Sequence, residues 1–226
     1  MFIDPYYMIY MLPAFVLMMF ATWYVNAAYR KWSQVAASSR LTGYQAAQRL
    51  VAASGLYGLQ IKGIAGEMTD RYDPRDNTLY LSRRVAETPS VASLAIAAHE
   101  LGHALQDKEG YLPLRFRSAI VPMVNIGSYL GWILIVAGLI LGWTNLAWLG
   151  VVFFSGGAVF ALATLPVEWN ASQRARRLLT ESGILYSEEE RRGVNHVLNA
   201  AALTYVAALI TALLQLLYFV GLIRRR

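Results

Sequence analysis

The stretch that decides the fold and the chemistry of this chain reads Ala97-Ala98-His99-Glu100-Leu101-Gly102-His103-Ala104-Leu105. It contains an H-E-x-x-H pattern within a run of good helix formers. On a helix, side chains four residues apart lie on one face, a turn from each other. His99 and His103 can therefore bind one Zn²⁺, and Glu100 can take a proton from a water on that ion. The pattern predicts a zinc peptidase site with Glu100 as the general base.

A five-residue pattern also arises by chance, and a histidine on a helix is often only a structural residue. This chain has three histidines in 226 residues, and two of them fall in the pattern. The flanking residues 93–96 and 104–106 are typical of a buried helix. Both observations favour a metal site over a coincidence.

The composition is typical of a membrane protein, because 57% of the residues are hydrophobic. There is no cysteine, which excludes disulfides and thiolate ligands, so any zinc must be bound by histidine and carboxylate side chains. The net charge of +6 is modest. The arginines lie beside apolar segments, which indicates membrane topology and contact with lipid headgroups rather than nucleic-acid binding.

Four uncharged stretches are long enough to cross a bilayer, which takes about 20 residues of helix. We predict membrane-spanning helices at residues 5–29, 118–141, 146–167 and 198–223. The start of the chain has Asp4 and no Lys or Arg, unlike a cleaved signal peptide, so we expect an uncleaved first span. Residues 142–145 supply the tight turn between the second and third spans.

Two polar segments, residues 30–117 and 168–197, separate the spans. In the first, Thr42 is expected to cap a helix that stops near Gly55, and Ser90 to cap the H-E-x-x-H helix. Short strands are expected at residues 59–62 and 78–81, with a turn over 73–77 between them. A free edge on the second strand could pair with an extended peptide, although a plain structural hairpin fits the pattern equally well.

Basic residues predict which side of the membrane these segments face. The first polar segment has five near its membrane ends, and the second has five: Arg30, Lys31, Arg40, Arg115 and Arg117, then Arg174, Arg176, Arg177, Arg191 and Arg192. The N-terminus and the inter-span turn have none. The positive-inside rule therefore places both polar segments in the cytoplasm. Four spans then put Arg224-Arg225-Arg226 outside, against the rule, and we expect the larger signal of the two segments to prevail.

A catalytic zinc takes three protein ligands and leaves one position open. Glu168 is the best-placed carboxylate, since it follows the third span and starts a helical segment. The alternatives are an ordinary interfacial carboxylate or an ion-pair partner of Arg115 or Arg117. His196 is the remaining histidine. It is a candidate to stabilise the oxyanion, or it is simply a residue near a helix start.

Four segments resemble the YugP-type neutral zinc metallopeptidases of bacterial membranes: residues 69–75, 97–106, 165–172 and 197–207. The resemblance implies an integral-membrane zinc protease. More distantly, the chain is similar to the HtpX- and Ste24-type membrane metalloproteases, whose third ligand lies in Glu-x-x-Ala-Asp. Here that pattern reads Glu168-Trp169-Asn170-Ala171-Ser172. Because Ser172 replaces the Asp, the residue that orients the zinc histidines stays open, with Asp70 and Asp73 as candidates.

Other classes fit less well. A site-2-type intramembrane protease has its H-E-x-x-H within a membrane span, whereas charged residues border this one closely on both sides. A membrane di-iron enzyme needs many more histidines than three. From a different class, a non-catalytic membrane scaffold would use a structural zinc whose four positions are all closed, with Glu168 and His196 joining the histidine pair.

We therefore predict a mainly α integral membrane protein of a bacterial plasma membrane. It has about four transmembrane helices and a small α+β, gluzincin-like zinc peptidase region formed by the two cytoplasmic segments. One Zn²⁺ is held by His99, His103 and Glu168, with Glu100 as the base and His196 as an oxyanion stabiliser. The expected partners are the lipid bilayer and a peptide or membrane-protein substrate, and no nucleic acid. The sequence indicates neither the substrate specificity nor the oligomeric state.

Overall fold

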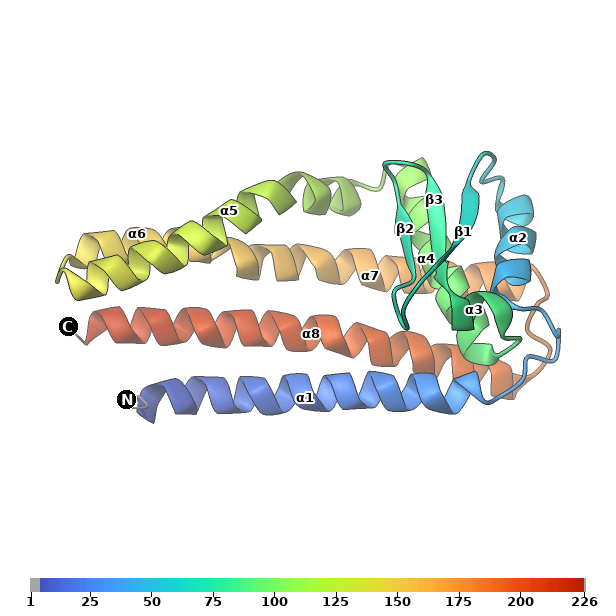
Figure 1. The fold of residues 1–226 in the computed structure, drawn as a ribbon, viewed down its shortest axis with the longest axis horizontal. Helices are drawn as coiled ribbons and strands as arrows, with labels where there is room; N and C mark the ends of the chain where they lie inside the picture. Colours follow the sequence, from blue (N-terminus) through green and yellow to red (C-terminus); the bar gives the residue numbers. More distant parts are fainter. Residues whose placement is uncertain (1–4, 226) are drawn as a thin grey trace. The chain divides into compact units, whose positions relative to one another are not determined.

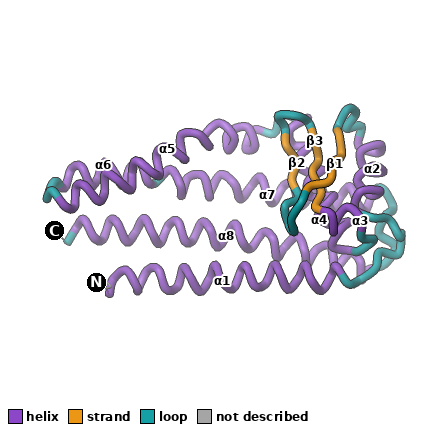
Figure 2. The backbone as a smooth tube through the Cα atoms, viewed as in Figure 1, coloured by secondary structure: helices purple, strands orange, loops and turns teal. Residues whose placement is uncertain are grey.

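The computed structural model describes residues 5–225, so Asp4 and Arg226 lie outside the described residues. It is built mainly of helices, which Figure 1 labels: α1 (Pro5–Ser33), α2 (Gly43–Ser54), α3 (Arg83–Glu87), α4 (Val91–Lys108), α5 (Leu112–Ile140), α6 (Thr144–Phe154), α7 (Gly156–Glu181) and α8 (Glu188–Arg224). Three short strands, orange in Figure 2, lie between α2 and α3 in the chain: β1 (Gln60–Ile64), β2 (Arg71–Asp73) and β3 (Thr78–Ser82).

Four helical stretches among the described residues are long and apolar enough to cross a membrane: α1, α5, α6 with α7, and α8. The prediction of a mainly α membrane protein with a small α+β region is confirmed. These helices run past the predicted spans, since α1 continues to Ser33 and α8 begins at Glu188. The limits of the spans themselves stay predictions.

The chain forms two compact units. Of the described residues, 5–22, 115–166 and 203–225 belong to the first unit, and 23–114 and 167–202 to the second. In the first unit, α5 and α6 pack closely because glycines face the neighbouring backbone. A Cβ on Gly131 would lie 2.5 Å from Phe154 N, and one on Gly150 would lie 2.6 Å from Ile135 N. Small residues permit such contact between membrane helices.

The second unit holds the sheet, in the order β1-β3-β2. β1 pairs with β3 in parallel and β2 pairs with β3 in antiparallel fashion. The expected free edge at residues 78–81 is therefore wrong, because β3 is central and its Leu79 and Leu81 are fully buried. The edges belong to β1 and β2. β2 went unpredicted because three residues are too few to show an alternating pattern.

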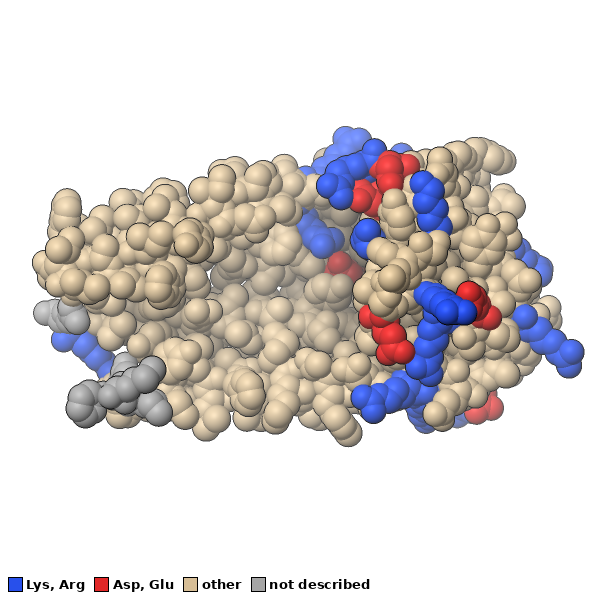
Figure 3. All heavy atoms as spheres, in the orientation of Figure 1, with Lys and Arg blue, Asp and Glu red and all other residues tan. Residues whose placement is uncertain are grey.

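The predicted helix ends in this unit are confirmed. Thr42 forms a capping box with Gln45, and Gly55 ends α2 in the left-handed region, with φ of 66°. The Ser90 hydroxyl accepts a hydrogen bond from the backbone of Ser93 and so begins α4. Most of α4 is buried, which agrees with the apolar residues that fill its first two turns. On the face shown in Figure 3, charged side chains gather over the strands and short helices of this unit.

Candidate zinc site

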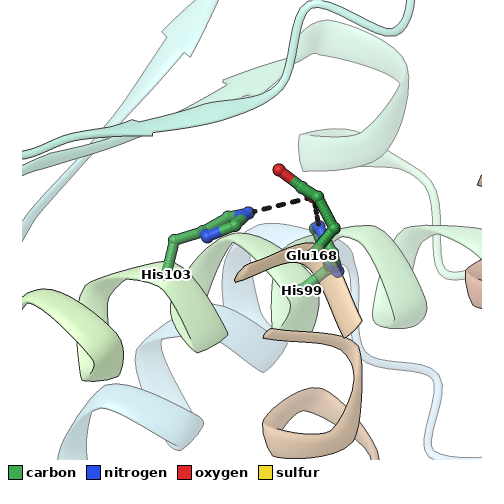
Figure 4. Close-up of side chains that lie close together, drawn as sticks. All are labelled: His99, His103 and Glu168. Atoms are coloured by element: carbon green, nitrogen blue, oxygen red, sulfur yellow. Dashed lines mark hydrogen bonds and ion pairs between the residues drawn. The ribbon is translucent and has the colours of Figure 1, made fainter. Parts of the chain in front are cut away.

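Three predicted ligands meet in the second unit. His99 and His103 project from α4 and Glu168 from α7, as Figure 4 shows. The Oε2 atom of Glu168 lies 3.2 Å from His99 Nε2 and 3.5 Å from His103 Nε2. One ligand atom from each residue lies within 4.8 Å of the others. Two imidazoles and one carboxylate form a donor set that suits zinc and leaves a position open for a reacting group.

Gly102, inside the H-E-x-x-H pattern, lets the two ligand-bearing helices meet. A Cβ at this position would lie 2.5 Å from the backbone oxygen of Ala171 in α7. Real Cβ atoms essentially never lie within 3.0 Å of such an atom, and ordinary contact begins at 3.4 Å. Any side chain here would therefore push α7, which carries Glu168, away from the histidines.

The far nitrogens of the two histidine rings have partners that the sequence analysis left open. Ser172 Oγ lies 3.2 Å from His99 Nδ1, so the serine that stands where the HtpX- and Ste24-type pattern has Asp contacts one of the predicted zinc ligands. Gln106 Oε1 lies 3.0 Å from His103 Nδ1. Such contacts orient the ring and fix which nitrogen is left for the metal. Gln106 went unpredicted, although its position three residues after His103 on a helix was a usable signal.

The two candidates that the sequence offered for this orienting role have other partners. Asp70 accepts hydrogen bonds from the backbone and the hydroxyl of Ser82, at 2.7 and 3.0 Å. Asp73 forms an ion pair with Arg75 at 2.7 Å. Asp70 thus braces the end of β3, and Asp73 braces the turn that follows β2. Neither orients the zinc histidines through a contact that the structure shows.

Glu100, the predicted base, contacts the sheet. Its Oε2 accepts a hydrogen bond of 3.0 Å from the backbone N–H of Tyr72 in β2. Burial raises the pKa of the Glu100 carboxyl above its usual value, and the neighbouring His99 and His103 partly offset the rise. Because the Tyr72 amide donates to Glu100, Tyr72 is a residue of the antiparallel ladder whose backbone groups face away from β3. The free edge of β2 therefore lies beside Glu100.

His196 is held by aromatic residues of α1. The indole N–H of Trp32 donates to His196 Nδ1 at 3.0 Å, and the Tyr24 ring lies 5.4 Å from the imidazole. Because an indole is only a donor, Nδ1 must be the acceptor, and the neutral ring carries its proton on Nε2. His196 is not part of the three-residue group of ligand atoms found among residues 5–225. Its role as an oxyanion stabiliser stays a prediction.

Comparison with known proteins agrees with this geometry. Residues 7–224 match the family described as "putative neutral zinc metallopeptidase". The chain belongs to this family. It is also 43% identical over 196 residues, 87% of each chain, to the Bacillus subtilis protein named "putative membrane protease YugP". No solved structure matches the chain. The family resemblance read from the sequence is confirmed, and the family's description names the metal for which the donor set is suited.

Proposed function

We propose that this protein is a membrane-embedded zinc metalloendopeptidase. The observation that supports this most is the convergence of His99, His103 and Glu168 next to a carboxylate, Glu100, that belongs to the same helix as the histidines. One zinc ion, when bound there, would polarise the scissile carbonyl and lower the pKa of a coordinated water. The two helices supply all three ligands, so the site depends on how α4 and α7 pack.

Glu100 is the group to which we assign proton transfer. A carboxylate on the same helix as the two histidines is suited to take a proton from the attacking water and return it to the leaving amine. The Tyr72 amide holds Oε2, which leaves Oε1 as the oxygen that exchanges the proton. His196 presents an N–H at Nε2, which is the chemistry needed to stabilise a developing oxyanion.

The free edge of β2 is the proposed docking site for the substrate. An extended peptide that adds to an edge strand is held by main-chain hydrogen bonds and accepts many side chains. The outward N–H of Tyr72 donates to Glu100, so the outward carbonyl of Tyr72 is the group that would accept a hydrogen bond from such a peptide and hold it beside Glu100. We therefore infer a substrate with an unfolded or extended segment, such as a loop of a membrane protein.

The active site is proposed to face the cytoplasm. Two predicted spans separate the H-E-x-x-H helix from Glu168, so both lie on one side of the membrane. The ten basic residues that border or lie in the two polar segments favour the cytoplasmic side.

The hydrogen bond to His196 favours an enzyme over a scaffold. A structural zinc closed by four ligands would need a free lone pair on His196. Trp32 occupies the lone pair of Nδ1, and the proton of the neutral ring lies on Nε2. His196 would have to give up its contact with Trp32 to bind a metal.

The test is a proteome-wide comparison of cleaved peptides between cells with the intact protein and cells with Glu100→Gln. We expect a set of membrane-protein fragments that depends on the intact carboxylate. Identical fragment sets, with both proteins present at equal level and equally loaded with zinc, would contradict the proposed activity.

A further inference from the structure

Gln106 is a fully buried polar residue on α4 whose side chain reaches across to α7. Its Oε1 lies 3.0 Å from His103 Nδ1. Its Nε2 donates to the backbone oxygen of Val167 at 2.7 Å and to Asn170 Oδ1 at 3.0 Å. Both α7 partners flank the third ligand, Glu168. One amide thus contacts a zinc histidine and the backbone next to the zinc carboxylate.

The partners determine which way this amide points. A backbone carbonyl only accepts, so the Gln106 atom facing Val167 must be the NH₂ group. Asn170 Oδ1 is identified independently, because it also accepts from Arg174 Nε at 2.7 Å. Arg174 is in turn anchored by an ion pair of 2.7 Å with Glu109. The Gln106 oxygen must therefore face His103.

An oxygen at this position determines the tautomer of the histidine. The Gln106 carbonyl can only accept, so His103 Nδ1 must donate its hydrogen. The neutral ring then has an unprotonated Nε2, which is the nitrogen 3.5 Å from Glu168 Oε2. Because Gln106 is fully buried, no water can replace a lost partner, so the loss of any of these hydrogen bonds would be costly.

We propose that Gln106 is a positioning residue of the zinc site. It holds His103 in the tautomer that binds metal through Nε2, and it fixes the segment of α7 that carries Glu168. This inference rests on the proposed zinc site and adds to it the device that joins the two ligand-bearing helices.

The first test is zinc affinity, measured by competition with a chelator on the purified full-length protein. Gln106→Met keeps the size of the side chain and removes all three hydrogen bonds. We expect a loss of about 10- to 100-fold, the usual effect of removing a partner of a metal-bound histidine. The matched control is Ser93→Ala, which removes a buried hydrogen bond from the same helix without touching a ligand. It should leave zinc affinity unchanged.

The second test reads the tautomer directly. The chain has only three histidines, so protein labelled with ¹⁵N-histidine gives a simple spectrum. Under conditions in which its ring is neutral, His103 of the metal-free parent protein should carry its proton on Nδ1. Gln106→Met should lose this single form. A His103 proton on Nε2 in the parent protein would overturn the proposal.

A milder pair of variants covers the case in which Gln106→Met does not fold. Asn170 is only half-buried, so changes there should be tolerated. Asn170→Asp keeps the acceptor for Gln106 and should retain zinc affinity, whereas Asn170→Ala should lower it. Equal zinc affinity in the parent, Asn170→Ala and any folded Gln106→Met would refute the role of Gln106. If the parent protein binds no zinc, the proposed function is refuted instead. The tautomer of His103 would still test its contact with Gln106.

Discussion

The contact at Gly102 predicts how sensitive the zinc site is to the spacing of its two helices. The Gly102→Ala change adds a Cβ at 2.5 Å from Ala171 O, against an ordinary limit of 3.4 Å. To restore an ordinary contact, α4 and α7 would separate by about 0.9 Å at this point, which is 3.4 minus 2.5. Metal sites tolerate deviations of only about 0.2 Å in ligand distance. Glu168 lies one turn from Ala171, so it should lose its bond to a zinc held by the histidines.

We expect Gly102→Ala to lower zinc affinity by about 100-fold or more, at the upper end of what a displaced partner costs. Overpacking should also lower the free energy of unfolding by about 1–3 kcal/mol. Chelator competition and thermal unfolding of the purified protein measure the two effects. Gly63→Ala is the control, because a Cβ there meets nothing within 4 Å. Parent-like zinc affinity in Gly102→Ala would show that the spacing of α4 and α7 does not hold the site.

Three further predictions concern the ligand, the base and the topology. Glu168→Ala should lower bound zinc sharply, since one of three ligands is lost. An unchanged metal content would show that the third ligand is another residue. Tyr72→Pro removes an N–H that faces Glu100 rather than β3, so the edge strand should tolerate it. Tyr72→Pro should keep zinc and lower kcat by about tenfold or more. Tyr72→Ala, which retains the amide, should lower kcat less. Equal kcat in the two variants would exclude a role for the amide. When Ser38, Asn145 and Ser187 are replaced singly by cysteine, only the cysteine at position 145 should react with an impermeant thiol reagent in intact cells. Labelling at position 187 but not at position 38 would place the two polar segments on opposite sides of the membrane, so that His99 and Glu168 could not share a metal.

Local signals in the sequence predicted the parts of the fold that depend on local chemistry. Threonine and serine, such as Thr42 and Ser90, favour the position just before a helix, whatever the rest of the fold. The H-E-x-x-H spacing brings two histidines to one face of any helix. Glu168 was predicted as the third ligand from its place in the sequence, directly after the third expected span and at the start of a helical segment. That argument needs no knowledge of how the helices pack.

Most of the features that were missed depend on tertiary contact. In the sequence, Gly102 looks like an ordinary helix residue, and only the structure shows that the backbone of Ala171 packs against it. Gln106 reads as a polar residue near the end of a helix, whereas it is fully buried because α7 covers it. The order of the strands, with β3 in the centre, follows from a parallel pairing of β1 and β3 that a hairpin-like sequence pattern does not reveal.

The central claim is that the zinc is catalytic, held by three protein ligands with a fourth position open. X-ray absorption at the zinc edge, with and without a small added thiol, tests it most directly. The chain has no cysteine, so any thiolate sulfur bound to zinc must come from the added compound. The account predicts two imidazoles and oxygen ligands without thiol, and one sulfur at about 2.3 Å when thiol is present. A spectrum with three imidazoles, unchanged by the thiol while the zinc content stays constant, would contradict the account and indicate a closed structural site.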